Sequence, residues 1–417
     1  MSSQPHDIVI LGNSFAGLRI AHVLLGDVIP NLPGPKRKFR IVFVAPSDRF
    51  YMNISSLRAL ARPPLVDDER LLPEFLPHFE KYRATAPVEF VQGYAAELDA
   101  ERRIVIVKRT GDSTETVEVP YDSLIIATGT STSTTAIKSR PTATAADIRK
   151  ELHDLAAEIK AASTIAIGGG GTTAVELSSD LREAYPDKRV TIYAGNSGIV
   201  SAFPELQRRT VADRLTQKFG ITIVNQRVTH TERNPKTGQY DITLAPAEGE
   251  ATAATVESVD LYISAVGQTP NTGFLPKTVL DERGYVVSDS HLRVTGLAPR
   301  VYVTGDASAL SAGNLDNVRT HTGALKETLK LELAAETAAD ESAFLYAVPK
   351  LKLPLHHFGV TLGSTGGVGL FNGHRIPSCI LRLMKARDAS ISGAAVMVGG
   401  SSFSLKLLVA QVKKEQA

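Results

Sequence analysis

Short apolar runs alternate with amphipathic stretches along the first part of the chain. The run Asp7–Leu11 ends at Gly12, and Gly17–Leu25 then carries apolar residues at helical spacing. A loop rich in Pro, Gly and Lys spans 30–38, and a second apolar run, Arg40–Ala45, follows it. The order strand, turn, helix, strand is typical of a parallel α/β unit.

The same pattern begins again near residue 164. Thr164–Ile167 predicts a strand, the glycines at 168–171 a turn, Ala174–Glu183 a helix and Arg189–Tyr193 another strand. Further apolar runs predict strands at 88–91, 103–108, 116–119, 124–127, 242–244, 261–265 and 301–304, with 103–108 and 116–119 as a hairpin. A helical pattern from 145 to 162 separates the two units and marks a candidate domain boundary.

Two such units predict an α/β chain with two Rossmann-like dinucleotide-binding domains. The 417 residues leave room for two to four domains. We expect the first domain at 1–143 and 257–340, the second inserted at 144–256, and a small C-terminal α+β domain at 341–417, where the sequence changes to Gly-rich strand material.

The turn after the first strand reads Gly12-Asn13-Ser14-Phe15-Ala16-Gly17. In a dinucleotide fold the first glycine permits the tight turn, the second lets the backbone approach the pyrophosphate, and the third lets helix and strand pack closely. The helix N-terminus then faces the phosphates. Ser14 stands at the second position, where its small side chain fits and its hydroxyl can donate to phosphate. These residues alone are equally compatible with an ordinary strand–helix turn.

The second turn gives a stronger signal. Gly169, Gly171 and Ala174 fit the G-x-G-x-x-A register, directly after a strand and at the start of a helix. Four consecutive glycines cost backbone entropy unless a close approach requires them, which favours a second dinucleotide site over a structural turn.

Two more apolar strands end in small-residue turns. Leu124–Ala127 leads to Thr128-Gly129, and Val301–Thr304 leads to Gly305-Asp306. An aspartate just past a strand end can accept hydrogen bonds from a sugar-like polyol. Alone it is more often a plain turn, but after an earlier dinucleotide turn it favours a flavin contact.

These four elements, in this order, resemble the two-dinucleotide-binding flavoproteins of the pyridine nucleotide-disulfide oxidoreductase superfamily over nearly the whole chain. In that family the first turn holds FAD and the second holds NAD(P)H. The resemblance assigns to FAD the residues Gly12, Ser14, Phe15, Ala16, Gly17, Thr128, Gly129, Gly305 and Asp306. It assigns to NADH or NADPH the residues Gly169, Gly171, Thr172, Thr173 and Glu176.

Three segments resemble one branch, the apoptosis-inducing-factor-like group that includes the AMID and ferroptosis-suppressor proteins. They are 50–53 (FYMN), 56–59 (SLRA) and 385–388 (KARD). The resemblance implies an FAD enzyme that oxidises NAD(P)H and passes electrons to quinones or other small acceptors. Arg58 is then expected to pair with the FAD phosphates, with a surface salt bridge as the alternative, and Ala95 to touch the adenine.

The adenosine positions depart from the family pattern. An acid at the end of the second strand bonds a ribose hydroxyl, whereas a nearby arginine accommodates a 2′-phosphate. Here the two positions are Ala45 and Ala194. Ser47 or Asp48 could replace the missing acid in the first unit. In the second unit Arg208-Arg209 are distant in sequence, so NADH and NADPH both stay open.

Composition narrows the chemistry. The single cysteine, Cys379, excludes a redox disulfide, so we expect direct electron transfer from flavin to a small-molecule acceptor. The chain has no tryptophan, which argues against Baeyer–Villiger monooxygenases, whose linker fingerprint ends in His and Trp. A net charge of +2 argues against a nucleic-acid partner. We predict no metal, because the adjacent His356-His357 point to opposite faces of a strand.

Glu176 and His321 are the candidate catalytic residues. Glu176 follows the second glycine turn. His321 begins a helical stretch after Asp306, where a helix N-terminus would face the flavin and stabilise its reduced anion; a solvated helix start explains it equally well. Two alternatives remain for the whole chain: a dedicated FAD oxidoreductase of a specialised biosynthetic pathway, or a slow redox-sensing or interaction flavoprotein.

The ends of the chain bear on location. Neither a secretory signal nor a run of 18 apolar residues is present, which predicts a cytoplasmic protein. The tail Ser401–Lys414 mixes apolar and basic residues. Packing on its own domain or on a second subunit is favoured over weak association with a membrane surface, which would give access to a lipid quinone. A monomer and a homodimer fit equally.

Overall fold

The computed structural model describes residues 4–33, 38–67, 69–111, 115–246, 255–335, 351 and 357–400. Its largest sheet has five parallel strands in the order β17-β7-β1-β2-β3. These strands are β1 (His6–Leu11), β2 (Phe39–Ala45), β3 (Val88–Gln92), β7 (Ser123–Ile126) and β17 (Val301–Val303). Because β17 comes from residue 301, the first domain is assembled from two distant parts of the chain.

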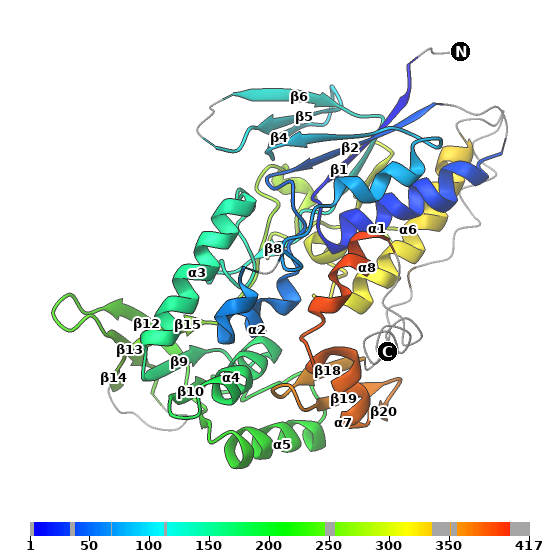
Figure 1. Ribbon diagram of the computed structural model, residues 1–417. Coiled ribbons are helices and arrows are strands. Elements are labelled where there is room, and N and C mark those ends of the chain that lie inside the picture. Colours follow the sequence, from blue (N-terminus) through cyan, green and yellow to red (C-terminus); the bar gives the residue numbers. More distant parts are fainter. Residues whose placement is uncertain are drawn as a thin grey trace.

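Both faces of this sheet are covered, which explains the continuous apolar runs of its strands. Helices α1 (Phe15–Val23) and α6 (Leu315–Ala335) lie side by side on one face (Figure 1). An antiparallel sheet of β4 (Tyr94–Asp99), β5 (Ile104–Lys108) and β6 (Thr116–Pro120) packs on the other. The pairing of β5 with β6 confirms the expected hairpin.

The second domain repeats the design on a smaller scale. Its parallel sheet has the order β11-β10-β9-β15, from β9 (Thr164–Gly168), β10 (Arg189–Tyr193), β11 (Thr222–Val224) and β15 (Leu261–Ser264). Helices α3 (Ala145–Ala161), α4 (Thr172–Ala184) and α5 (Glu205–Asp213) accompany it, with an antiparallel sheet of β12 (Val228–Arg233), β13 (Tyr240–Leu244) and β14 (Thr255–Val259). Since β15 pairs with β9, this sheet extends past the boundary expected at residue 256.

The linker between the domains begins with a local helix signal and a short strand pair. Thr144 caps α3: its hydroxyl accepts from the Asp147 backbone N–H, and the Asp147 carboxylate accepts from the Thr144 N–H. Strands β8 (Thr130–Ser131) and β16 (Thr269–Pro270) pair where the chain leaves and re-enters the first domain. Helix α2 (Ser56–Ala61) packs against both α3 and α4, so the first domain contacts the second directly.

The C-terminal domain is fastened to α4 by backbone N–H groups that donate to its side chains. The N–H of Gly363 donates to Ser179 Oγ over 3.0 Å, and that of Ser364 to Glu183 Oε2 over 3.0 Å. The domain contains β18 (Phe358–Thr361), β19 (Gly367–Phe371), β20 (His374–Arg375), α7 (Ser378–Leu381) and α8 (Ala394–Val398). Figure 1 shows β18–β20 and α7 beside α4 and α5, with α8 reaching back to α1.

A buried histidine joins α8 to the first domain. The ring of His22 on α1 stacks on Phe79 with centroids 4.3 Å apart, and its Nε2 lies 2.7 Å from the Val398 carbonyl oxygen. Burial lowers the pKa of His22 to about 4, so the ring is neutral near pH 7.

The α/β architecture with two parallel sheets confirms the fold expected from the sequence. Among the helices that the structure describes, none is both long and apolar enough to cross a membrane. The tail at 401–414 and His356 lie outside the described residues, so the expectations placed on them stay predictions.

Candidate active site

One cavity of about 1590 Å³ extends from the first glycine turn to the C-terminal domain. Of the residues expected to hold cofactors, it is lined by Gly12, Ser14, Phe15, Ala16, Ala95, Thr128, Gly129, Thr172, Thr173, Glu176, Gly305 and Asp306. Segments that are far apart in the sequence therefore meet around a single space, as the two-site interpretation requires.

Two positions of the first turn have room for glycine only. Gly12 has φ +106°, and a Cβ there would lie 2.4 Å from the Ala127 carbonyl oxygen. A Cβ on Gly17 would lie 1.9 Å from the Gly12 carbonyl oxygen, so Gly17 packs helix on strand and does not line the cavity. Asn13 Nδ2 donates to the Ser47 carbonyl over 2.7 Å and ties the turn to the end of β2.

Three observations fit a dinucleotide against this turn. Thr128 lines the cavity, and its hydroxyl oxygen is buried with no hydrogen-bond partner among the described residues. A Cβ on Gly305 would lie 2.7 Å from the Ala16 Cβ. Because Gly305 has no side chain, its backbone can pack close to the start of α1. The N-terminal residues of α1 and of α6 both line the cavity, and helix N-termini favour phosphate.

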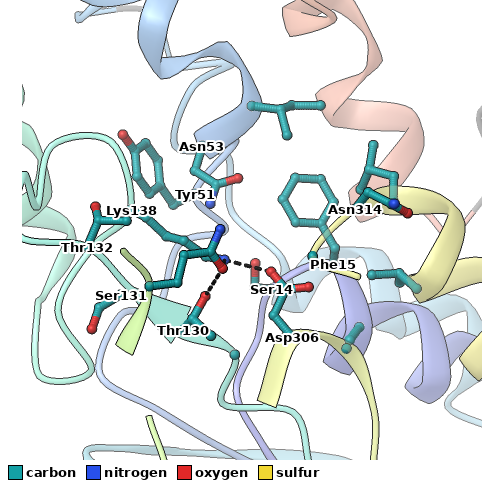
Figure 2. A pocket seen from close by; sticks show the side chains of 18 of the residues that line it. Ser14, Phe15, Tyr51, Asn53, Thr130, Ser131, Thr132, Lys138, Asp306 and Asn314 are labelled. Atoms are coloured by element: carbon teal, nitrogen blue, oxygen red, sulfur yellow. Dashed lines mark hydrogen bonds and ion pairs between the residues drawn. The ribbon is translucent and has the colours of Figure 1, made fainter. Parts of the chain in front are cut away.

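Asp306 meets a cation that sequence reasoning missed. Lys138 Nζ, from the Ser/Thr-rich linker, lies 2.6 Å from Asp306 Oδ2. Thr130 Oγ1 donates to Gln268 Oε1 over 2.9 Å in the same area. Figure 2 shows Lys138, Thr130 and Asp306 close to one another, with Ser14 beside Asp306. No spacing rule points to Lys138, because only the fold brings the linker to the end of β17.

Glu176 is buried and forms a half-buried ion pair with a residue of the C-terminal domain. Its side chain is 8% exposed, and both carboxylate oxygens lie 2.7 Å from Lys385 Nζ. The backbone N–H of Thr361 also donates to Oε1 over 3.0 Å. Glu176 and Lys385 both line the cavity. The catalytic role of Glu176 stays a prediction, whereas Lys385 appeared in the sequence only as part of the KARD segment.

The expectation for Arg58 is corrected. Its guanidinium does not line the cavity; Nη2 lies 2.7 Å from Asp180 Oδ1 on α4, with side chains 2% and 4% exposed. The alternative of a surface salt bridge is also wrong, because this pair is buried. Arg58 Nη2 also donates to the Ala386 carbonyl over 3.1 Å, so its role is to join α2, α4 and the C-terminal domain.

The expectation for His321 is corrected as well. Helix α6 begins at Leu315, so His321 lies in its second turn, where it is fully buried and does not line the cavity. Desolvation lowers the pKa of His321, although the Leu310 carbonyl and the Asp306 carboxylate oppose the shift. The neutral ring is part of the core beneath Asp306, and neither the catalytic role nor a solvated helix start fits it.

The second glycine turn lies beside the cavity. Gly169 has φ +122°, and a Cβ there would lie 2.7 Å from the Ala265 carbonyl oxygen. Gly171 is the N-cap of α4, and neither glycine lines the cavity, although Thr172 and Thr173 do.

Two residues of the first domain, Ser47 and Asp48, were candidates to replace the missing acid after β2. Ser47 lines the cavity, but its hydroxyl is hydrogen-bonded to the Arg49 backbone. Asp48 is exposed and lies outside the cavity.

The far end of the cavity is apolar. It is lined there by Phe203, Phe358, Leu370, Phe371, Ile376, Leu381 and Met384. Phe203 and Phe358 are stacked with centroids 3.8 Å apart, and the His357 ring stacks on Phe371 at 4.3 Å. Cys379 is exposed and does not line this space.

This is the architecture of the two-dinucleotide-binding oxidoreductases. It has a split parallel sheet with a glycine turn at α1, an inserted sheet with a second glycine turn at α4, and a cavity between them. The chain belongs to the pyridine nucleotide-disulphide oxidoreductase family, whose sequence pattern matches residues 6–332.

Two relatives align with nearly the whole chain. The chain is 27% identical over 409 residues to Oxidoreductase phnG of Penicillium herquei, covering 93% of this chain and 94% of that protein. It is 25% identical over 392 residues to Ferroptosis suppressor protein 1 of Xenopus laevis, covering 92% and 94%. An engineered water-forming NADPH oxidase bound to NADPH has a similar fold, with a TM-score of 0.64 at 15% identity over 87% of this chain and 74% of that one. The expected membership of the superfamily is thereby confirmed, and ferroptosis suppressor proteins are among the relatives, as the resemblance implied.

Proposed function

We propose that this chain is an FAD-dependent NAD(P)H oxidoreductase that passes electrons directly to a quinone-like acceptor. The observation that carries the proposal is the continuous cavity, which joins the first glycine turn, the α4 residues after the second, and an apolar wall. FAD, when bound, would supply the redox chemistry between NAD(P)H and the acceptor.

The protein's own residues bind and orient the reactants. Gly12 and Gly305 leave the backbone beside α1 without side chains, and the buried hydroxyl of Thr128 has no partner among the described residues. The N-terminal turn of α6 lines the cavity, so its partial positive charge favours negative charge there. Lys385 Nζ and the Glu176 carboxylate, 2.7 Å apart, can hold or release a proton at the junction of α4 with the apolar wall.

The apolar wall supports a planar, weakly polar acceptor. Aromatic rings such as Phe358 and Phe371 stack against flat conjugated molecules. With one cysteine, exposed and outside the cavity, the chain offers no dithiol to relay electrons. Direct transfer to the acceptor is the route that these side chains allow.

Anaerobic rapid mixing tests the proposal. The protein with FAD bound should be bleached by NADPH or NADH, and a soluble short-chain benzoquinone should then reoxidise it at least tenfold faster than oxygen or oxidised glutathione. Failure of both nucleotides to bleach the flavin, or reoxidation by the quinone no faster than by oxygen, would reject it. The second failure would favour the slow redox-sensing alternative.

A pair of variants locates the acceptor. Phe371 lines the cavity and is 53% exposed. The Phe371→Ser variant should have a KM for the quinone that is about tenfold higher, which corresponds to about 1.4 kcal/mol of lost binding free energy. The rate of bleaching by nucleotide should not change. Val256, 60% exposed on β14 and outside the cavity, is the matched control, and Val256→Ser should leave both quantities at wild-type values.

A further inference from the structure

The loop after β10 occupies the position where a Rossmann unit holds the adenosine ribose. Strand β10 ends at Tyr193, and the loop 194–198 has the sequence AGNSG. Ala194 stands where an acid would bond the 2′-hydroxyl of NADH. This loop therefore presents no carboxylate to select NADH or to repel a 2′-phosphate.

The fold brings a cation to this loop. Arg208, in the first turn and a half of α5, donates from Nη2 to the Ser197 carbonyl oxygen over 2.9 Å. The same Nη2 lies 3.3 Å from the position of a Cβ on Gly198. Arg208 is half-buried, and among the described residues it forms no ion pair with a carboxylate. Its charge is thus held at the loop without a counter-ion there.

Its neighbour in sequence provides the contrast. Arg209 is 75% exposed and forms an i,i+4 ion pair with Glu205 on the same helix. The two adjacent arginines therefore differ: the Arg208 side chain contacts the loop, whereas the charge of Arg209 is neutralised by Glu205.

The arginine-bearing loop and the second glycine turn form one continuous surface. The Val200 N–H donates to the Gly170 carbonyl over 2.6 Å, and the Gly198 carbonyl oxygen lies 2.5 Å from the position of a Cβ on Gly170. A dinucleotide with its pyrophosphate at the glycine turn consequently has its adenosine at the loop that Arg208 supports.

We infer that Arg208 binds the 2′-phosphate of NADPH and makes NADPH the preferred donor over NADH. The inference rests on the proposed function, because it requires a nicotinamide nucleotide at the second glycine turn. A guanidinium matches phosphate oxygens with two parallel N–H groups, so one such contact gives tenfold or greater discrimination when no carboxylate opposes it.

Binding of nucleotide fragments tests this without turnover. Calorimetric titration of the FAD-loaded protein should show 2′,5′-ADP binding at least tenfold more tightly than 5′-AMP. Arg208→Gln keeps a donor for the Ser197 carbonyl but removes the charge, and it should abolish the difference while changing the Kd of 5′-AMP less than twofold. Arg209→Gln, on the same helix, is the matched control and should retain the full preference. Ala194→Asp should reverse it.

Two results would overturn the inference: equal Kd values for the two fragments in the wild type, or equal losses in the Arg208 and Arg209 variants. If NADH and 5′-AMP bind and NADH bleaches the flavin without a 2′-phosphate advantage, only the role of Arg208 is rejected. If no nucleotide or fragment binds while FAD is retained, the proposed function fails together with it.

Discussion

Replacing Arg58 with methionine should destabilise the protein by an amount that depends on pH. Methionine keeps an unbranched side chain of similar reach but leaves the Asp180 carboxyl buried without its cation. The two groups lie 2.7 Å apart and both are almost fully buried, so water cannot take over the role of the guanidinium. The variant also distinguishes this role from the FAD-phosphate role that the sequence suggested.

The magnitude follows from the ionisation of Asp180. Burial raises its pKa from 3.8 to about 6, with the Arg58 charge opposing the shift. A folded-state pKa above the unfolded value means that stability falls as pH rises from 3.8 to 6 and is level above that. Ionisation of Asp180 therefore lowers the free energy of unfolding at pH 7.5 by about 3 kcal/mol relative to acid pH. Without Arg58 we expect the folded protein to keep Asp180 protonated. The decrease in the free energy of unfolding at pH 7.5 then approaches about 5 kcal/mol.

The electrostatic penalty of Arg58→Met is the difference, about 2 kcal/mol at pH 7.5. At pH 5.5 it falls close to zero, because Asp180 is by then mostly protonated in the wild type too. Urea unfolding at the two pH values measures it, followed by circular dichroism because the chain has no tryptophan to report by fluorescence.

Arg62 is the matched control. It pairs with Glu183 on α4 over 3.2 Å, but its side chain is 46% exposed, so Arg62→Met should cost less than about 1 kcal/mol at either pH. An Arg58→Met penalty that is independent of pH, or no larger than that of Arg62→Met, would refute the reasoning. Loss of FAD with unchanged stability would restore the phosphate role.

Three further outcomes are expected. Gly12→Ala should reduce FAD absorbance per protein at least tenfold, whereas Gly111→Ala, also at positive φ but with open space around it, should retain FAD; equal retention would contradict the turn geometry. Because His22 has a folded pKa of about 4 and an unfolded one of 6.5, wild-type stability should fall by about 2 kcal/mol between pH 6.5 and 4.5, and His22→Gln should lack this part of the loss in paired urea titrations. Thr144→Ala should cost about 1 kcal/mol in the same assay, and no change would show that the cap is redundant.

Features that depend on neighbouring residues were predictable from the sequence. The strand before Gly12, the glycine turn before α4 and the start of α3 after Thr144 follow from periodicity, bare backbone and capping. Residues expected to line the cofactor sites mostly do line the cavity, because strand ends and glycine turns carry them there.

Features that depend on pairing across the chain were not predictable. Arg58 and Asp180 are 122 positions apart, and Glu176 and Lys385 are 209 apart, so no local pattern connects them. A charged residue takes its role from the group that it meets when the domains dock. Arg58 forms an ion pair with the buried Asp180 carboxylate, so a residue that we expected to contact the flavin lies in the core instead.

The attachment of the C-terminal domain to α4 has a consequence for engineering. Its backbone N–H groups donate to Glu176, Ser179 and Glu183, side chains on one face of a helix that belongs to the other domain. The apolar acceptor wall is therefore not a self-contained module. A chimaera that takes residues 357–400 from a relative to change the range of acceptors must also take the residues at these three positions of α4. Otherwise the backbone N–H groups of the C-terminal domain that face α4 are left without acceptors.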